Sequence, residues 1–286
     1  MFRILHRTWL LSLVIAGLNV CTAVGAEKAP ATLLVKDSLT SPNQPATVEA
    51  RLVSKGLMTS AGLGGELLEL VAYGKVVATA MTGGDGTAFL SFTPKAQGVI
   101  PVQVRVSQSP RVAPAEGQGH LAIWERRNPI IAVEMASLME EPSSPAPLPG
   151  VGLTIESERK PMPNAVEELG KLTQFYYRVV YVVSSSARID SFQASVAARD
   201  WLKAQKFPLG YVLVLPPGEQ ALGEKIDALH AAGWTTIKTG VGRSKAFVEA
   251  FLQRRLEAVM VPEPAKGEAP RKAKVAKEWK EIRKKL

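Results

Sequence analysis

The chain has one cysteine and three histidines among its 286 residues. The cysteine, Cys21, lies in the amino-terminal segment, and once that segment is removed neither a disulfide nor thiol chemistry remains. His120 and His230 lie outside any cluster with the spacing of metal ligands, so we expect no zinc site and no bound cofactor. A chain with so few cross-linking residues depends on its hydrophobic core for stability.

Long apolar runs are also absent. The run from Trp9 to Gly17 is shorter than the roughly 20 residues that a spanning helix needs. It follows a basic start and precedes a small-residue cleavage site ending at Ala26, so residues 1–26 are predicted to be a secretory signal. The mature protein is then periplasmic or extracellular. Lipidation of Cys21 is an alternative that the large Val20 before it disfavours.

Net positive charge is small outside the two ends of the chain. The formal net charge is +9, and residues 1–26 hold two basic residues and no acid, so the remainder carries +7. Residues 266–286 hold nine basic and three acidic residues, which leaves residues 27–265 near +1. The sequence pI of 9.6 therefore reflects mainly the basic residues 266–286 and not a basic surface on the folded domains, so a nucleic-acid-binding fold is disfavoured.

Residues 31–126 are predicted to form an all-β domain. Apolar and polar residues alternate in short runs at 47–53, 67–71, 88–92, 98–106 and 120–124, with Gly, Pro, Asn and Asp between several of them. The run D-G-T-A-F-L-S-F-T-P and the following G-V-I-P-V-Q-V-R-V resemble bacterial immunoglobulin-like modules. We expect a β-sandwich with Phe89 and Val102 in its core, acting as a spacer or an adhesive surface.

Residues 128–262 are predicted to form a second, α/β domain. Apolar strands are expected at 130–133, 178–183, 211–215, 235–239 and 258–261, and helices at 164–175, 191–205, 219–232 and 244–255. This alternation favours a three-layer fold in which helices cover both faces of a parallel sheet. Polar residues at the carboxyl ends of the strands would then share one edge.

The segment P-I-I-A-V-E-M-A-S, which ends at Ser137, resembles the first strand of haloacid-dehalogenase-type (HAD-like) phosphatases. The resemblance is to the phosphatidate-phosphatase branch found in lipins and phosphatidylinositol-transfer proteins. That family carries D-x-D-x-T here, with a nucleophilic and an acid-base aspartate, and these positions match Glu134 and Ala136. Its metal-binding loop, G-D-R-x-x-D-V-x-A-Y, matches residues 242–251, where Arg243 and Phe247 replace the two acids.

These replacements predict a degenerate catalytic site that holds no metal. Mg²⁺ prefers hard oxygen ligands, and an arginine in the loop repels it. Ala136 cannot protonate a leaving group, which forgoes a rate factor of roughly 10²–10⁴. We therefore interpret the domain as a pseudo-phosphatase.

A site that has lost its catalytic residues can still bind an anion. The resemblance implies a phosphate-holding hydroxyl at the end of the second strand, where Ser184 and Ser185 stand, and a phosphate-neutralising lysine at Lys225. With Arg243, these residues could bind a phosphate. The alternative, which we favour, is a structural ion pair between Arg243 and Glu134, because a buried acid usually has a partner.

The carboxyl terminus, residues 263–286, is predicted to be a basic tail that begins as a linker. Val275, Trp279, Ile282 and Leu286 recur with helical spacing. One reading is a membrane-surface helix in which Trp279, Ile282, Lys284 and Lys285 contact anionic lipid. The other is a segment docked on its own domain, or a solvated tail.

The sequence therefore leaves three functional hypotheses. The preferred one is an exported, non-catalytic binding or scaffold protein with an unidentified protein or anionic ligand as partner. The second is a phosphate- or anionic-phospholipid-binding protein. The third is a residual Mg²⁺-dependent phosphatase that uses Glu134.

Overall fold

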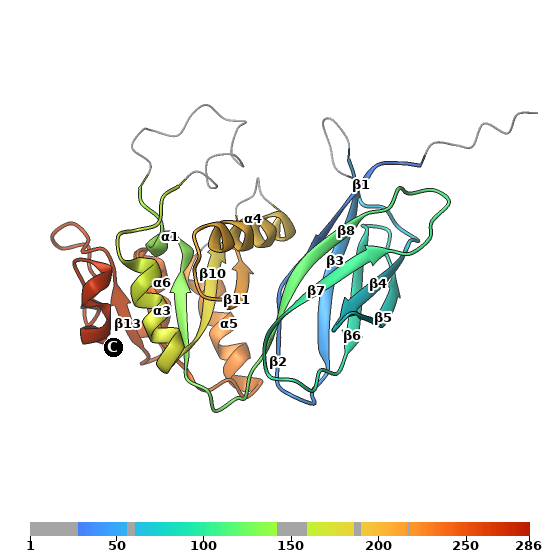
Figure 1. Cartoon of the computed structure of the whole chain (residues 1–286). Coiled ribbons are helices and arrows are strands. Elements are labelled where there is room, and N and C mark those ends of the chain that lie inside the picture. The colour runs from blue at the N-terminus through green and yellow to red at the C-terminus, as the bar shows by residue number, and fades with distance from the viewer. Residues whose placement is uncertain (1–27, 56–60, 142–158, 186–189, 217) are drawn as a thin grey trace, which may run out of the picture.

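The computed structural model describes residues 28–55, 61–141, 159–185, 190–216 and 218–286. Up to residue 123 the regular elements are strands, and beyond it strands alternate with helices (Figure 1). The predicted secretory signal with Cys21 lies outside the described residues. Within the described ranges, no helix has the length and apolar character needed to span a membrane.

The first part of the chain folds into two sheets. Its strands are β1 (Ala31–Val35), β2 (Ser38–Thr40), β3 (Ala46–Ser54), β4 (Leu67–Ala72), β5 (Lys75–Met81), β6 (Thr87–Phe92), β7 (Gly98–Val106) and β8 (Glu116–Ile123). One sheet has the order β1-β3-β6 and the other β2-β8-β7-β4-β5. Neighbouring strands run antiparallel, except β2 and β8, which are parallel.

A single apolar cluster fills the space between these two sheets, and Leu52, Leu70 and Leu121 are among its fully buried members. The prediction for Val102 is confirmed, since it is 2% exposed, but that for Phe89 is wrong, since it is 63% exposed. Successive strand residues face opposite sides, so the buried Leu90 next to it forces Phe89 outward. The more specific immunoglobulin-like assignment stays a prediction.

The second part contains a parallel sheet. Its strands are β9 (Ile130–Glu134), β10 (Arg178–Ser184), β11 (Tyr211–Leu215), β12 (Ile237–Gly242), β13 (Glu257–Met260) and β14 (Lys274–Val275). They lie in the order β11-β10-β9-β12-β13-β14, and every neighbouring pair is parallel. The predicted α/β character is confirmed. The predicted strand at 235–239 lies two to three residues further along the chain, at Ile237–Gly242.

Helices cover both faces of this sheet (Figure 1). They are α1 (Met135–Leu138), α3 (Ala165–Phe175), α4 (Ser191–Ala204), α5 (Glu219–Ala231) and α6 (Lys245–Leu252). Along β9, Ile131 and Val133 pack with α3 and α4, whereas Ile130 and Ala132 pack with α5 and α6. This burial on both faces explains why β9 and β10 are nearly continuous apolar runs.

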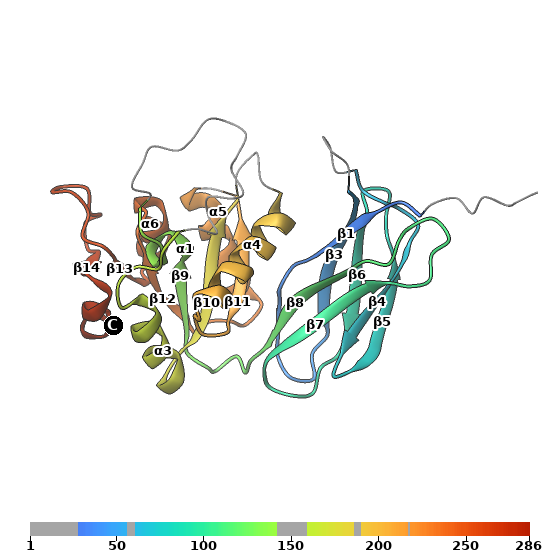
Figure 2. The ribbon, with the colours of Figure 1, turned by 45° about the horizontal axis from the view of Figure 1, so that its top comes forward.

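The carboxyl terminus docks on the second part and does not form a separate tail. β14 extends the sheet beside β13, as Figure 2 shows, and η1 (Trp279–Glu281) and α7 (Ile282–Lys285) follow it. Trp279 and Ile282 are fully buried, and the Trp279 indole N–H donates to the carbonyl of Ser137 at 2.8 Å. These two side chains are therefore not available to a membrane, which corrects that hypothesis; Lys284 remains exposed.

A buried acid contributes to this docking. Glu168 on α3 is 4% exposed and accepts hydrogen bonds from Arg283 and Lys171. Burial alone would raise the pKa of Glu168, but the bonds from these two cations hold it below its ordinary value. Arg283 of the carboxyl terminus thus helps to neutralise an acid of its own domain.

The two parts of the chain meet at a buried ion pair. Arg199 of α4 donates to Asp37, which lies between β1 and β2, at 2.7 Å, and the two side chains are 8% and 0% exposed. Asp37 also accepts from the backbone N–H groups of His120 and Val212. A single carboxylate therefore ties β8, α4 and β11 together.

Candidate functional site

The candidate site lies where the strand order reverses. β9 is central, and its neighbours β10 and β12 lead to helices on opposite faces of the sheet. Glu134, Ser184 and Gly242 are the last residues of these three parallel strands, so the topology brings them to one edge of the sheet. The three strands lie next to one another in Figure 2. In parallel sheets, the carboxyl ends at such a reversal are where ligands usually bind.

Glu134 is held by three donors at this edge. Its Oε2 accepts from the backbone N–H groups of Arg243 and Ser244 at 2.7 and 2.8 Å. Its Oε1 accepts from the Ser244 hydroxyl at 2.5 Å, and the side chain is 8% exposed. The same hydroxyl accepts from the N–H of Phe247 and so caps α6. The carboxylate therefore occupies the anion position at the start of this helix.

The Arg243 side chain does not pair with Glu134, so the favoured ion pair is wrong. Its guanidinium instead donates to the carbonyl of Met139 at 2.9 Å and lies 3.6 Å from the exposed carboxylate of Glu141. Only the backbone of Arg243 contacts Glu134. The backbone N–H groups of Arg243 and Ser244, just after β12, already donate to the carboxylate that a guanidinium would otherwise bind. Sequence spacing did not reveal this partner.

Phe247, which the sequence resemblance matches to the second loop acid, is a core residue. Phe247 is 3% exposed and packs against Phe251, with ring centroids 5.2 Å apart. Gly242 makes this possible, because a Cβ there would lie 2.3 Å from Cδ1 of Phe247 and 2.9 Å from Oε2 of Glu134. The aromatic ring thus takes the space beside the strand end. Ala136 is exposed at the same edge.

The structure brings together only part of the predicted anion site. Ser184 and Glu134 line one cavity of about 170 Å³. Ser185 lies next to it, but its hydroxyl and its N–H both donate to the carbonyl of Leu215. Lys225 lies on α5 and lines a different cavity, of about 400 Å³, together with Asp37. Lys225 therefore does not line the cavity that Ser184 and Glu134 share.

The cation at this cavity is Arg159, which the sequence did not predict. Arg159 lies outside the motifs that carry the resemblance, and the fold places it in the lining of the same cavity as Ser184. Its backbone carbonyl accepts the Trp201 indole N–H at 2.8 Å. Its Nε is buried and has no hydrogen-bond partner in the described structure. Most of the remaining lining is apolar, with Met135, Met139, Val182, Ala194, Ala197, Ala198 and Trp201.

Metal ligands do not gather at this edge. The described residues contain no group of three or more His, Cys, Asp or Glu side chains with the proximity that a metal ion needs. Glu134 is the acid at the end of β9, and its oxygens already accept three hydrogen bonds. Mg²⁺ at this point would have to displace those donors.

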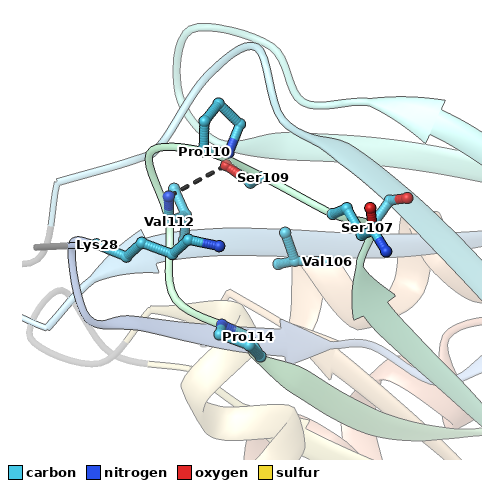
Figure 3. Close-up of a pocket in the computed structure, with 8 residues that line it drawn as sticks. Lys28, Val106, Ser107, Ser109, Pro110, Val112 and Pro114 are labelled. Carbon is cyan, nitrogen blue, oxygen red and sulfur yellow. Dashed lines mark hydrogen bonds between the residues drawn. The ribbon is translucent and has the colours of Figure 1, made fainter. Parts of the chain in front are cut away.

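A larger cavity, of about 560 Å³, lies in the first part of the chain beside the loop from β7 to β8 (Figure 3). Lys28, Val106 and Pro114 line it, and the Ser109 hydroxyl accepts from the N–H of Val112 at 3.1 Å. It shares no residue with the edge around Glu134 and contains no acid or histidine. It does not contribute to the candidate site.

Comparison with known proteins gives no family. No family model matches the chain, and no curated protein matches it. A solved D,D-heptose 1,7-bisphosphate phosphatase from Burkholderia thailandensis is similar over 54% of this chain and 96% of its own, with 14% identity and a TM-score of 0.38. A chimeric titin Z1Z2 is similar over 33% of this chain and 93% of its own, with 14% identity and a TM-score of 0.23. The PKD domain of human KIAA0319 covers 35% of this chain and 88% of its own, with 15% identity and a TM-score of 0.22.

Proposed function

We propose that this chain is an exported, non-catalytic binding or scaffold protein. In this proposal, an immunoglobulin-like module is joined to a HAD-like, pseudo-phosphatase domain. The observation that carries the proposal is the environment of Glu134, whose carboxylate accepts three hydrogen bonds from the start of α6. A carboxylate bound in this way links β9 to β12 and α6 and is poorly placed to attack phosphorus.

The chemistry around Glu134 supports the same proposal. In-line phosphoryl transfer needs a positioned nucleophile, a proton donor and charge neutralisation. Here the proton-donor position is the methyl group of Ala136, and the loop-acid position is the buried ring of Phe247. A misplacement of the nucleophile by about 1 Å can itself cost around 100-fold in rate. Without a positioned nucleophile, a proton donor and charge neutralisation, we expect no phosphoryl transfer at this site.

The buried pair between Asp37 and Arg199 supports a scaffold function. It joins the two parts through residues that have little exposure, so their surfaces keep a defined mutual position. A scaffold needs such rigidity because a partner that contacts both parts then meets a preformed surface. Anion binding has weaker support, since Lys225 and Ser184 line different cavities.

The test uses the full chain and its Glu134→Gln variant. Both are assayed with a generic phosphomonoester and with phosphatidic acid, each with and without Mg²⁺. We expect no turnover from either protein. The variant should lose about 2 kcal/mol of unfolding free energy, because an amide cannot accept all three hydrogen bonds and its NH₂ group faces a donor.

Glu141→Gln is the matched control, since Glu141 lies at the same edge but its side chain is 80% exposed. It should retain wild-type stability within about 0.5 kcal/mol. Mg²⁺-dependent turnover that Glu134→Gln abolishes in a folded protein would overturn the proposal in favour of a residual phosphatase.

A further inference from the structure

A cavity of about 360 Å³ lies at the opposite edge of the parallel sheet from Glu134. Arg178, the first residue of β10, and Leu209, just before β11, line it. Val99 of β7, Trp124 just after β8 and residues of α3 also line it. The cavity is therefore built from both parts of the chain, whose mutual position the buried ion pair maintains.

Two cations line this cavity without an acid to neutralise them. Arg178 and Lys206 are both exposed, and neither forms an ion pair with any residue in the described parts of the chain. Arg199 of α4, by contrast, is paired with Asp37. The nearby acid Glu257 is itself paired with Lys274. Two unpaired positive charges at a cavity favour a ligand that carries carboxylates.

Lys206 also stands where a glycine is usual. It follows α4 with φ of +61°, the left-handed conformation that commonly ends a helix and that glycine adopts without strain. A side chain with a Cβ costs roughly 1 kcal/mol in this conformation. The fold therefore holds a lysine at the cavity against a local conformational cost.

Gly170 is a second residue that stability does not explain. It lies in the middle of α3 and lines the cavity, and a Cβ added there would meet nothing within 4 Å. Glycine inside a helix costs about 0.5–1 kcal/mol relative to alanine. Its effect here is to keep the cavity open to the helix backbone, as a closely approaching ligand requires.

Large apolar side chains continue from the cavity onto the surface. Phe175 and Tyr176 are each 73% exposed, and Leu209 is 63% exposed. Tyr176 lies next to Tyr177 of the cavity lining, with ring centroids 6.0 Å apart. Exposed apolar residues grouped beside a cavity are typical of interaction sites. A ligand that filled only the cavity would leave Phe175 and Tyr176 in water, so a longer molecule fits better than a small acid.

We propose that this cavity, with Phe175, Tyr176 and Leu209 around it, is the docking site for a segment of a partner protein that presents carboxylates next to large apolar side chains. The inference rests on the proposed binding function and names the class of partner. The carboxylates bind Arg178 and Lys206, and an apolar side chain enters the cavity against α3. The Glu134→Gln assay and the peptide-binding test below can fail independently of each other, because Glu134 and this cavity lie at opposite edges of the sheet.

The test measures fluorescence anisotropy of labelled decapeptides mixed with the full chain at physiological ionic strength. One peptide alternates glutamate with phenylalanine and leucine, the second replaces glutamate by lysine, and the third replaces the apolar residues by serine. We expect saturable binding of the first peptide only. No binding of it at concentrations up to roughly 1 mM would overturn the proposal.

Two variants separate binding from folding. Lys206→Gly and Gly170→Leu should each leave the protein as stable as wild type or more stable, because each relieves a local cost. Each should nevertheless weaken binding of the first peptide about tenfold, by removing a charge-assisted contact or by filling the cavity. Lys203→Gln is the matched control on exposed α4 surface outside the cavity and should change binding less than about twofold.

Folded variants that bind as wild type would overturn the proposal. Phenylacetate serves as the small-acid probe. If phenylacetate displaces the first peptide completely, and if Phe175→Ser and Tyr176→Ser leave peptide binding unchanged, the cavity binds a small carboxylic acid. The proposal of a polypeptide partner is then wrong.

Discussion

Replacement of Arg199 by methionine should strongly destabilise the protein and loosen the junction between its two parts. Arg199 donates to the Asp37 carboxylate at 2.7 Å and also to the carbonyl groups of Val35 and Gln118. Methionine keeps much of the volume but removes every donor. Asp37, whose side chain has no exposed surface, then keeps only backbone N–H partners.

The magnitude follows from the burial. Removing one partner of a buried ion pair typically costs 3–5 kcal/mol, because the other charge stays buried without compensation. Asp37 keeps two N–H donors, from His120 and Val212, so the lower part of this range applies. We expect a loss of about 3–4 kcal/mol of unfolding free energy, which corresponds to about 10 °C in Tm for a chain of this size.

The assay is urea unfolding followed by tryptophan fluorescence, with hydrogen exchange as a second measurement. The backbone amides of His120 and Val212 donate to Asp37, so their exchange should accelerate in Arg199→Met. Arg105→Met is the matched control, because Arg105 pairs with Glu69 at the surface and is 51% exposed. It should cost less than about 1 kcal/mol.

A double-mutant cycle completes the design. Asp37→Asn removes the buried charge, so the variant that combines it with Arg199→Met should be about 2 kcal/mol more stable than additivity predicts. The reasoning is refuted if Arg199→Met costs no more than Arg105→Met and leaves exchange at His120 unchanged. The junction would then depend on apolar packing and not on the ion pair.

Three further predictions concern other elements. Trp279→Ala should cost about 3–5 kcal/mol in urea unfolding, because the side chain is fully buried, and a loss under 1 kcal/mol would contradict the docked carboxyl terminus. Burial lowers the pKa of His120 below its ordinary value of 6.5, so on acidification the unfolded state takes up the proton before the folded state does. The contribution of His120 to the free energy of unfolding should therefore be constant above pH 6.5 and fall towards pH 5. His120→Gln should flatten that slope. Gly242→Ala should cost at least about 2 kcal/mol of unfolding free energy, because the added Cβ would overlap the ring of Phe247. Gly84→Ala is the control, since a Cβ there meets nothing within 4 Å, and it should cost less than about 1 kcal/mol. Equal thermal shifts of the two variants would contradict the packing at the end of β12.

Local patterns predicted most elements of the fold. The strand at 211–215 agrees with β11 in both bounds, and the helices at 191–205 and 219–232 agree with α4 and α5 to within one residue. Such runs depend on the burial period of a single segment, which the sequence displays directly. Short elements without a full period, such as β2, β14 and α1, had no comparable signal.

The site was predicted in part. The sequence located Glu134, Ser184 and residues 242–251 at the ends of neighbouring strands, and the structure places them at one edge. It did not predict that the backbone of Arg243 would bind Glu134, or that Lys225 would line another cavity. Hydrogen-bond partners depend on distances between strand ends, which residue spacing does not contain.

The amino-acid sequence by itself determined the order of most strands and helices and which residues stand at the ends of the strands of the parallel sheet. The tertiary structure decided how those residues are used. Asp37 and Arg199 are 162 positions apart, and the indole of Trp279 meets a carbonyl 142 positions away. The free energy of such pairs comes from burial between elements, and burial exists only once the elements have packed.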